Sequence, residues 1–478
     1  MADRSASYGV LVPIALAAFV TSLDNTVVNV ALPSMQRELG LGVSGLQWIA
    51  TSYILAFSSL LLAGGRLTDL YGRRTLFLIG LGLFVAASVL AGVASSGEFL
   101  VAARVLQGIG AALVLPATLA VLSADLGGAS RHLGAGVFTA AIALALALGP
   151  VVGGAISEYW HWSWIFFVNV PLGLLTMTLG ARTIGRDRGE RVAIDVGGLL
   201  TSTVAMATLT YGLIEGNEKG YASTDILGAF GVASLGAAAF VLVERRAKAP
   251  MVDVTLFANR VFSGGTAAQV LWGLGINGVF FFTSLFLQDV LALSPTAAGT
   301  MFVPLAVVLI LAVPLAPLLA TRVGVHRTVA GGMALIAAGL VWVSFVGRGD
   351  SALALVPGLV LIGFGSALTT PLTSAVLEVV PAAKAGVAAA VISAAREVSG
   401  VLGIALTGAV VAARQAAAVH DGVTQVDAFA SGYATGLWCS AVLAGLGGVI
   451  SIVALRPPFP LMAGAAAPAE TPALTVVP

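Results

Sequence analysis

An acidic residue stands inside a long apolar stretch near the start of the chain. Asp24 lies within residues 9–31, where almost all of its neighbours are hydrophobic. A charged side chain at the centre of a membrane-spanning helix costs about 2.5–3.5 kcal/mol on insertion scales. Because desolvation disfavours the charged carboxylate, this group can bind a proton and release it when water or a cation approaches. Asp24 is therefore a candidate proton site, and the alternative is a packing carboxylate paired permanently with an arginine.

Two arginines and a second acid stand within other apolar stretches. Arg104 lies within residues 99–122, at a level where it can meet Asp24. Protonation of such a buried pair leaves an uncompensated charge that biases the equilibrium between two helix arrangements; the alternative is a static ion pair. Arg396 and Glu397 are adjacent in a later stretch, where Glu397 is either a second proton or cation site or the neutraliser of Arg396. Adjacent residues do not face each other on a helix, so we expect each to have another partner.

The residues that other chemistries need are missing from the chain. There is no GxxxxGK[ST] loop for ATP, and the single cysteine, Cys439, excludes an internal disulfide and a cysteine-rich metal site. None of the histidines falls within the core of an apolar stretch, so no metal-ligand set is visible; they are His132, His161, His326 and His420. The sequence therefore predicts no enzyme and no cofactor, and coupling must depend on carboxylates.

Composition defines the elements that position these residues. Of 478 residues, 58% are hydrophobic and 9% are charged, against roughly 25% charged in an ordinary soluble protein. This excludes a soluble globular enzyme and predicts an all-α membrane protein. The net charge of +1 gives no sign of nucleic-acid binding, which requires a basic patch.

Fourteen apolar runs, separated by charged or Pro/Gly-rich breaks, predict fourteen membrane-spanning helices. They cover residues 9–31, 46–64, 76–94, 99–122, 134–157, 164–182, 194–215, 225–243, 261–289, 296–320, 329–347, 351–377, 386–411 and 430–455. If both termini are cytoplasmic, 17 of the 23 lysines and arginines lie on the inner side and two lie within helices. The four on the outer side are Arg37, Lys219, Arg348 and Arg414. The positive-inside rule therefore places both termini in the cytoplasm.

An internal repeat divides the chain. Leu106–Leu122 (LQGIGAALVLPATLAVL) and Leu361–Leu377 (LIGFGSALTTPLTSAVL) are identical at ten of seventeen positions. The fourth and twelfth helices are thus copies, which predicts two six-helix bundles, residues 1–192 and 246–456, with two inserted helices in residues 193–245. Residues 457–478 are Ala/Pro-rich and predict a disordered cytoplasmic tail. Parallel halves of this kind build transporters whose site lies at their interface near the membrane midplane.

Five stretches carry a family resemblance. They are LDNTVVNVALP from Leu23, GRLTDLYGRRTL from Gly65, RVLQGIGAA from Arg104, GPVVGG from Gly149 with WSWIFFVNVP from Trp162, and LFLQDV from Leu285. In their order and spacing the chain resembles the major facilitator superfamily, specifically its fourteen-span drug/proton antiporters. The resemblance implies the major facilitator fold and the export of multidrug or antibiotic-like compounds in exchange for protons.

The resemblance also assigns roles to two groups of residues. The loop between the second and third helices would latch a cytoplasmic gate through Gly65, Asp69, Gly72, Arg73 and Arg74, the alternative being a basic loop that only sets topology. The fifth helix would supply a hinge and leak seal through Gly149, Pro150, Gly153 and Gly154, the alternative being ordinary small-residue packing. The chain departs from the family at Ala145 and Ser163, and at Glu397 and Ser399, where the usual residues are glycine, arginine, glutamine and glycine.

Polar and aromatic residues on apolar helices are the candidates for substrate contact, although such aromatics also pack helices or face lipid. They are Gln47, Trp48, Tyr53, Asn277, Phe281 and Gln288. A pocket of this kind suits a small lipophilic substrate. The sequence thus predicts a monomeric, multi-pass exporter of the bacterial inner membrane that uses protons and binds no nucleic acid. The alternatives are a proton-coupled carrier of a polar metabolite (an amino acid, a sugar or a siderophore) and a non-transporting receptor or enzyme.

Overall fold

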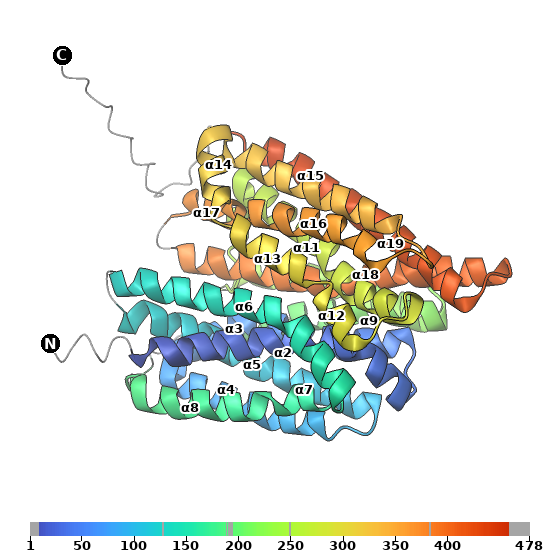
Figure 1. The fold of residues 1–478 in the computed structure, drawn as a ribbon. Coiled ribbons are helices and arrows are strands. Elements are labelled where there is room, and N and C mark those ends of the chain that lie inside the picture. The colour runs from blue at the N-terminus through green and yellow to red at the C-terminus, as the bar shows by residue number, and fades with distance from the viewer. Residues whose placement is uncertain are drawn as a thin grey trace, which may run out of the picture.

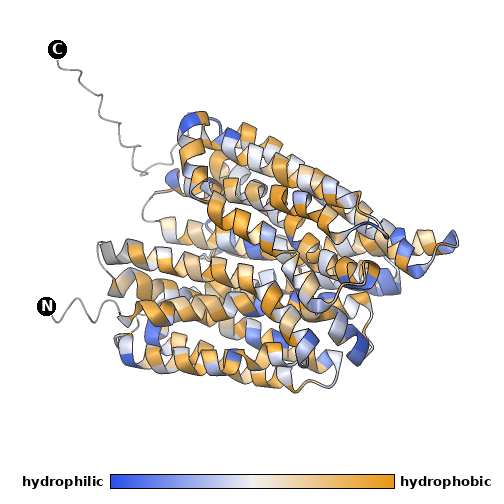
Figure 2. Ribbon diagram, viewed as in Figure 1, coloured by the Kyte–Doolittle hydropathy of each residue, from blue (hydrophilic) through white to orange (hydrophobic). Residues whose placement is uncertain are grey.

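The computed structural model describes residues 9–126, 129–187, 189, 195–247, 250–381 and 384–457, without the side chains of residues 125 and 129–132. The side chain of His132 and nearly all of the C-terminal tail lie outside this description. Fourteen of the helical segments are long and apolar enough to cross a membrane, which confirms the predicted all-α class and number of spans. Hydrophobic residues run along the helices, and hydrophilic ones concentrate at their ends (Figure 2).

The helices follow one another in a simple up-and-down order (Figure 1). The N-terminal half contains α2 (Leu11–Leu39), α3 (Val43–Tyr71), α4 (Arg73–Gly92), α5 (Gly97–Asp125), α6 (Ala129–Tyr159), α7 (Trp164–Phe167) and α8 (Asn169–Thr183). The inserted pair is α9 (Val196–Lys219) and α10 (Thr224–Arg246). The C-terminal half contains α11 (Arg260–Leu285), η2 (Phe286–Val290), α12 (Pro295–Thr300), α13 (Val303–Ala312), α14 (Leu315–Val323), α15 (Val325–Ser344), α16 (Val356–Leu368), α17 (Pro371–Glu378), α18 (Ala385–His420) and α19 (Gln425–Ala454).

Many helices run further than their apolar stretches indicate, α2 and α18 among them. Helix α2 continues to Leu39 and α18 to His420. Arg37 and Arg414 therefore lie within helices and not in the loops between them, and their location on the outer side of the membrane stays a prediction. Backbone hydrogen bonding continues into polar turns, so an apolar run marks the part of a helix in lipid and not its full length.

The internal repeat has an identical packing role in both halves. In α5, a Cβ on Gly108 would meet the backbone of α3, and one on Gly110 would meet the carbonyl oxygen of Gly80 in α4. In α16, Gly363 faces the backbone of α13 and Gly365 faces Gly332 of α15 in the same way. Each Gly-x-Gly thus lets one helix approach a neighbour on either side, which only residues without a side chain permit.

The apolar core is single at one end of the molecule and divided at the other. The largest cluster of buried apolar side chains joins the two halves and includes Val27 of α2 and Leu285 of α11. Two separate clusters lie elsewhere, one around Phe77 in the N-terminal half and one around Phe262 in the C-terminal half. The halves are therefore packed together at one end and parted at the end where α2 begins and α19 ends (Figure 1).

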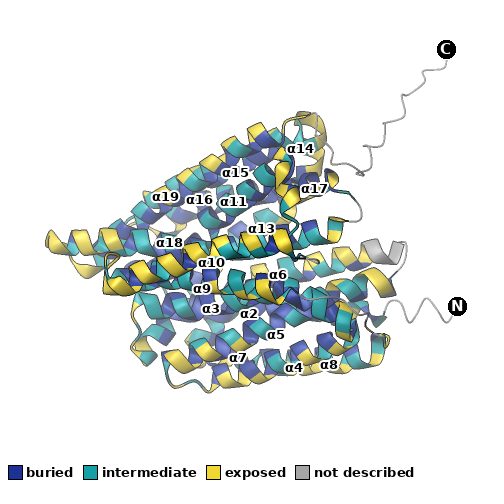
Figure 3. Ribbon diagram, turned by 180° about the vertical axis from the view of Figure 1, so that it is seen from behind, coloured by how far each residue is buried: buried dark blue, intermediate teal, exposed yellow. Residues whose placement is uncertain are grey.

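The inserted helices lie across one seam between the halves. Helix α9 packs against α3, against α18 and against α10, while α10 presents mostly exposed residues (Figure 3). The polar contacts of α9 go to α3: Trp48 Nε1 donates to Glu215 Oε1 at 2.8 Å, and Ser44 hydrogen-bonds Glu218. The inserted pair is thus hydrogen-bonded to the N-terminal half and packs against the C-terminal half.

Candidate functional site

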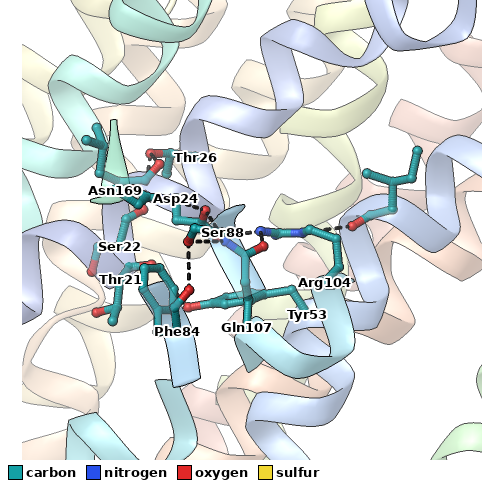
Figure 4. Close-up of polar contacts among 12 residues, drawn as sticks. Thr21, Ser22, Asp24, Thr26, Tyr53, Phe84, Ser88, Arg104, Gln107 and Asn169 are labelled. Carbon is teal, nitrogen blue, oxygen red and sulfur yellow. Dashed lines mark hydrogen bonds and ion pairs between the residues drawn. The ribbon is translucent and has the colours of Figure 1, made fainter. Parts of the chain in front are cut away.

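A fully buried polar network lies inside the N-terminal half (Figure 4). At its centre is Asp24 of α2, whose side chain has no solvent exposure. Arg104 of α5 forms an ion pair with Asp24 Oδ2 through Nη1. Gln107 Nε2 and Asn169 Nδ2 donate to Asp24 Oδ1 at 3.0 and 2.7 Å. The carboxylate therefore accepts three N–H donors, an arrangement that satisfies its charged form.

Arg104 is held from several directions. Its Nε donates to the carbonyl oxygen of Ile49 in α3 at 3.3 Å, and Nη1 also donates to Gln107 Oε1 at 3.0 Å. The guanidinium carbon lies 4.4 Å from the ring centre of Tyr53, a cation–π distance. Its Nη2 is buried and has no hydrogen-bond partner within the described ranges. The Nη2 group of the guanidinium can thus donate a hydrogen bond to one further acceptor.

Only two members of this network, Asp24 and Arg104, are predicted from the sequence. Gln107 and Asn169 stand inside stretches that carry the family resemblance, and Gln107 is three residues after Arg104, so the two share a helix face. That spacing is the signal that could have identified Gln107. Ser88 Oγ of α4 accepts from Gln107 Nε2 at 2.9 Å, and no sequence feature distinguishes it from other helical serines.

The second charged pair lies on α18. Arg396 Nη2 is 2.9 Å from Glu397 Oε1, and the two side chains are 54% and 20% exposed. The expectation that each has another partner is wrong, because the long arginine side chain folds back onto the next residue. Glu397 shares a helix face with Ile404, whose carbonyl oxygen accepts a hydrogen bond from Gln47 of α3. Glu397 therefore faces the N-terminal half.

The turn between α3 and α4 is held by a residue outside the predicted gate. Gly72 has a φ of +87°, which glycine adopts without strain, and a Cβ there would lie 2.8 Å from Asp187 Oδ1. Asp187 Oδ2 accepts from the backbone N–H of Arg73 at 3.0 Å and so satisfies a free donor at the start of α4. Arg74 Nη2 donates to the carbonyl oxygen of Ala181 at 2.5 Å.

The other two predicted gate residues make weaker contacts. Asp69 is exposed, and the described ranges contain no hydrogen-bond or ion-pair partner for it. A Cβ on Gly65 would only touch Pro116 of α5, at 4.0 Å. The contacts described for this turn thus stay within the N-terminal half, at the end where the core is divided.

The predicted hinge residues of α6 face two neighbours in different halves. A Cβ on Gly149 would lie 2.0 Å from Thr26 Oγ1, and one on Gly153 would lie 2.5 Å from the carbonyl oxygen of Val27. Both contacts join α6 to α2 within one turn of Asp24. The structure therefore brings this pair of glycines close to the buried network.

The other two hinge residues of α6 face the C-terminal half. A Cβ on Gly154 would lie 2.3 Å from the carbonyl oxygen of Pro295 in α12. Conversely, a Cβ on Gly299 would lie 2.1 Å from the carbonyl oxygen of Pro150. Backbone meets backbone here, so this seam closes without side chains between the helices. Helix α6 therefore connects the network helix α2 to the opposite half.

The six predicted substrate residues lie in separate places in this arrangement of the described helices. Two of them bridge the halves: Gln47 Nε2 donates to the carbonyl oxygen of Ile404 at 3.0 Å, and Gln288 Nε2 donates to that of Val30 at 2.9 Å. Each bond crosses from one half to the other near the end where the core is continuous. In the present arrangement these two glutamines therefore hydrogen-bond the two halves to each other at that end.

The remaining four lie in separate places. Trp48 points to Glu215 of the inserted helix, and Tyr53 packs on the arginine of the buried network. Asn277 Nδ2 donates within its own helix at 2.9 Å, and Phe281 is completely buried. A substrate site made of these side chains therefore requires a different arrangement of the halves.

The fold and the site define a class of membrane protein. Fourteen apolar helices form two halves and an inserted pair, with a repeated packing motif, a buried ion pair and halves that separate at one end, as in a secondary transporter. The chain belongs to the Major Facilitator Superfamily, whose family model matches residues 14–404. This is a family of transporters, and the chain is a multi-pass membrane protein.

Known proteins that are similar to this chain agree with its assignment to this family. The chain is 36% identical over 406 residues to the multidrug resistance protein Stp of Mycobacterium tuberculosis, covering 84% of this chain and 75% of Stp. It is 35% identical over 437 residues to the puromycin resistance protein pur8 of Streptomyces alboniger, covering 88% and 86%. The fold is similar to that of a bacterial homologue of the lysosomal transporter Spinster in an inward-facing, unoccupied conformation, with a TM-score of 0.67, 14% identity and coverage of 94% and 97%.

Proposed function

We propose that this chain exports lipophilic, drug-like or antibiotic-like compounds in exchange for protons by alternating access. The observation that carries the proposal is the buried Asp24–Arg104 ion pair in a chain whose halves are joined at one end and parted at the other. Relatives named for multidrug and puromycin resistance support the substrate class. The exporter works as a monomer in the bacterial inner membrane with both termini in the cytoplasm.

Proton binding changes the charge balance of the network. Asp24 now accepts from Arg104, Gln107 and Asn169. Protonation removes the negative charge and occupies one carboxylate oxygen, so Arg104 becomes a buried cation without a counter-charge. Breaking a buried pair in this way costs about 3–5 kcal/mol, enough to favour another arrangement of the helices.

The path from the network to the opposite half runs through α6 and α3. Gly149 and Gly153 pack α6 against the residues of α2 that directly follow Asp24. Gly154, on the same helix, packs against α12 of the opposite half. On α3, Tyr53 packs on Arg104, and Gln47 hydrogen-bonds the carbonyl oxygen of Ile404 in α18. We assign the bundles of residues 1–192 and 246–456 as the bodies that rock along these two seams, with residues 193–245 carried by the first.

The proposal is tested with purified protein in liposomes under an imposed protonmotive force. One elementary charge crossing 100 mV supplies about 2.3 kcal/mol, enough for roughly fortyfold accumulation of a lipophilic compound such as puromycin. We expect the parent to accumulate the compound and Asp24→Asn to allow only downhill movement. Asp421→Asn, at an exposed acid in the loop after α18, is the matched control and should behave as the parent.

A second variant guards against misfolding. Asp24→Asn alone leaves Arg104 buried without a counter-charge, whereas the double variant Asp24→Asn/Arg104→Gln removes both charges and spares that penalty. We expect the double variant to fold, to bind the compound and to lack gradient-driven accumulation. Full accumulation by either variant would refute the role of Asp24, and a parent that accumulates sugars or amino acids but no lipophilic compound would refute the substrate class.

A further inference from the structure

A cavity of about 170 Å³ opens between the halves at the end where the core is continuous. The N-terminal half contributes the ends of α2 and α3, and the C-terminal half contributes η2, α18 and α19. Its lining combines one carboxylate, three amides, one aromatic ring and aliphatic groups: Asp289, Gln36, Gln415, Gln425, Phe429, Val43, Leu285, Val290 and Val426. None of the six predicted substrate residues is in this lining.

The carboxylate is presented by an unusual piece of backbone. Phe286–Val290 forms a π-helical turn, η2, at the end of α11, and such turns are frequent at functional sites. The turn is fastened on both sides, because Phe286 stacks on Tyr433 at 4.6 Å and Gln288 bonds to α2 across the seam. Asp289 lies between these anchors and has no hydrogen-bond or ion-pair partner in the described part of the chain.

The chemistry of the lining fits an organic cation. A carboxylate supplies the counter-charge, Phe429 supplies a ring face for a cation–π contact, and the glutamines supply carbonyl acceptors for N–H groups. The volume is below the roughly 300–1,000 Å³ of sites that enclose a whole drug-sized molecule. The cavity therefore has room for one charged group with a small apolar substituent.

We propose that this outer cavity is a subsite for the ammonium group of an exported amine, with Asp289 as its counter-charge. The proposal rests on the export function proposed above and adds a site on the exit side, separate from the buried Asp24 network. The subsite predicts that cationic compounds bind in the outer cavity before release, whereas uncharged compounds are released without binding there.

Arg37 places a positive charge beside the subsite. It stands in the last turn of α2, in the opposite half, directly after Gln36 of the lining. Its Nη2 donates to Ser34 Oγ at 3.2 Å, and it forms no ion pair with Asp289 in the described part of the chain. The outer end is closed in this structure, and Asp289 is still without a counter-charge there. Because like charges repel, the charge of Arg37 opposes a bound cation, and removing it should tighten cation binding.

The test compares two probes that differ only in charge. Benzyltrimethylammonium carries a quaternary nitrogen, and neopentylbenzene has carbon in its place. Binding to purified protein in lipid nanodiscs is measured by calorimetry, so the result does not depend on transport. We expect a dissociation constant for the cation at least about tenfold lower than for the neutral probe, a loss of that preference in Asp289→Asn, and tighter cation binding in Arg37→Gln.

Controls separate this site from surface charge and from the export function. Asp350→Asn removes an exposed acid in the loop before α16 and should leave the preference unchanged, while Asp289→Glu should retain it. Equal preference in the parent and Asp289→Asn would overturn the subsite, as would an equal loss in Asp350→Asn. Gradient-driven transport of lipophilic compounds by Asp289→Asn would leave the export proposal intact, so the two can fail independently.

Discussion

Replacing Gly154 by alanine should open the seam between α6 and α12. The added Cβ would stand 2.3 Å from the carbonyl oxygen of Pro295, and ordinary contact begins at 3.4 Å, so the backbones must separate by about 1.1 Å. Overpacking of this kind costs about 1–3 kcal/mol. Because the cost applies only when the seam is closed, the open arrangement should gain about 5- to 150-fold in population.

The assay follows a single thiol at the seam. In a Cys439→Ser background, Thr296→Cys places a thiol where the threonine hydroxyl is now buried, so it reacts slowly with a polar maleimide while the seam is closed. Adding Gly154→Ala should raise the reaction rate of this thiol in detergent by the same factor. Gly136→Ala is the matched control, since this glycine is on the same helix and a Cβ there meets nothing within 4 Å.

Two outcomes would refute this reasoning. One is a reaction rate in Gly154→Ala that does not exceed that of the parent, which would mean that the seam yields locally without opening. The other is an equal rise in Gly136→Ala, which would trace the effect to the stability of α6 and not to its contact with the opposite half.

Three further changes test other contacts. Trp48→Phe removes the hydrogen bond to Glu215 and should lower the free energy of unfolding by about 1.5–3 kcal/mol, seen in thermal unfolding; an altered KM with unchanged stability would instead make Trp48 a substrate contact. Asn169→Leu removes one of three donors to the buried carboxylate, so it should cost about 1–3 kcal/mol of stability and reduce gradient-driven accumulation in the liposome assay. Undiminished accumulation would separate this amide from coupling. Burial acts to raise the pKa of Asp253, but hydrogen bonds from Lys384, 2.6 Å away, and Thr255 outweigh it and leave that pKa below its usual value. This pair therefore stabilises the protein above the unfolded pKa of about 3.9, and its contribution is lost as pH falls through the lower folded pKa. Thermal unfolding from about pH 6 to pH 3 should show the parent losing its advantage over Lys384→Met, and a constant difference would contradict the assignment.

Much of the architecture can be predicted from the sequence because membrane helices must satisfy their backbone internally and be apolar outside. The fourteen spans and the Leu106–Leu122 repeat follow from that constraint, and the repeat appears in the structure as two equivalent glycine contacts. The meeting of Asp24 and Arg104 follows as well, since two buried opposite charges in one half have few other ways to be satisfied.

The contacts between helices are harder to predict from the sequence. Asp187 follows α8 in a polar segment, and nothing in its surroundings indicates that it caps a helix more than a hundred residues earlier. The destinations of Trp48 and Gln288 depend on which helix faces lie together, and that is a property of the packed halves. Asp289 is visible in the LFLQDV stretch, but its place in a cavity depends on the π-helical turn, which hydropathy does not report.

The position of the inserted helix pair makes the two sides of the molecule unequal toward the bilayer. Because α9 covers the line where α3 meets α18, hydrocarbon chains have no direct access to that line. The line between α6 and α13 has no such cover among the described helices. A compound dissolved in the lipid would thus reach the helices of the two halves directly along the second line and not along the first, so bulky substitutions on the lipid face of α6 or α13 should slow its uptake while those on α10 should not.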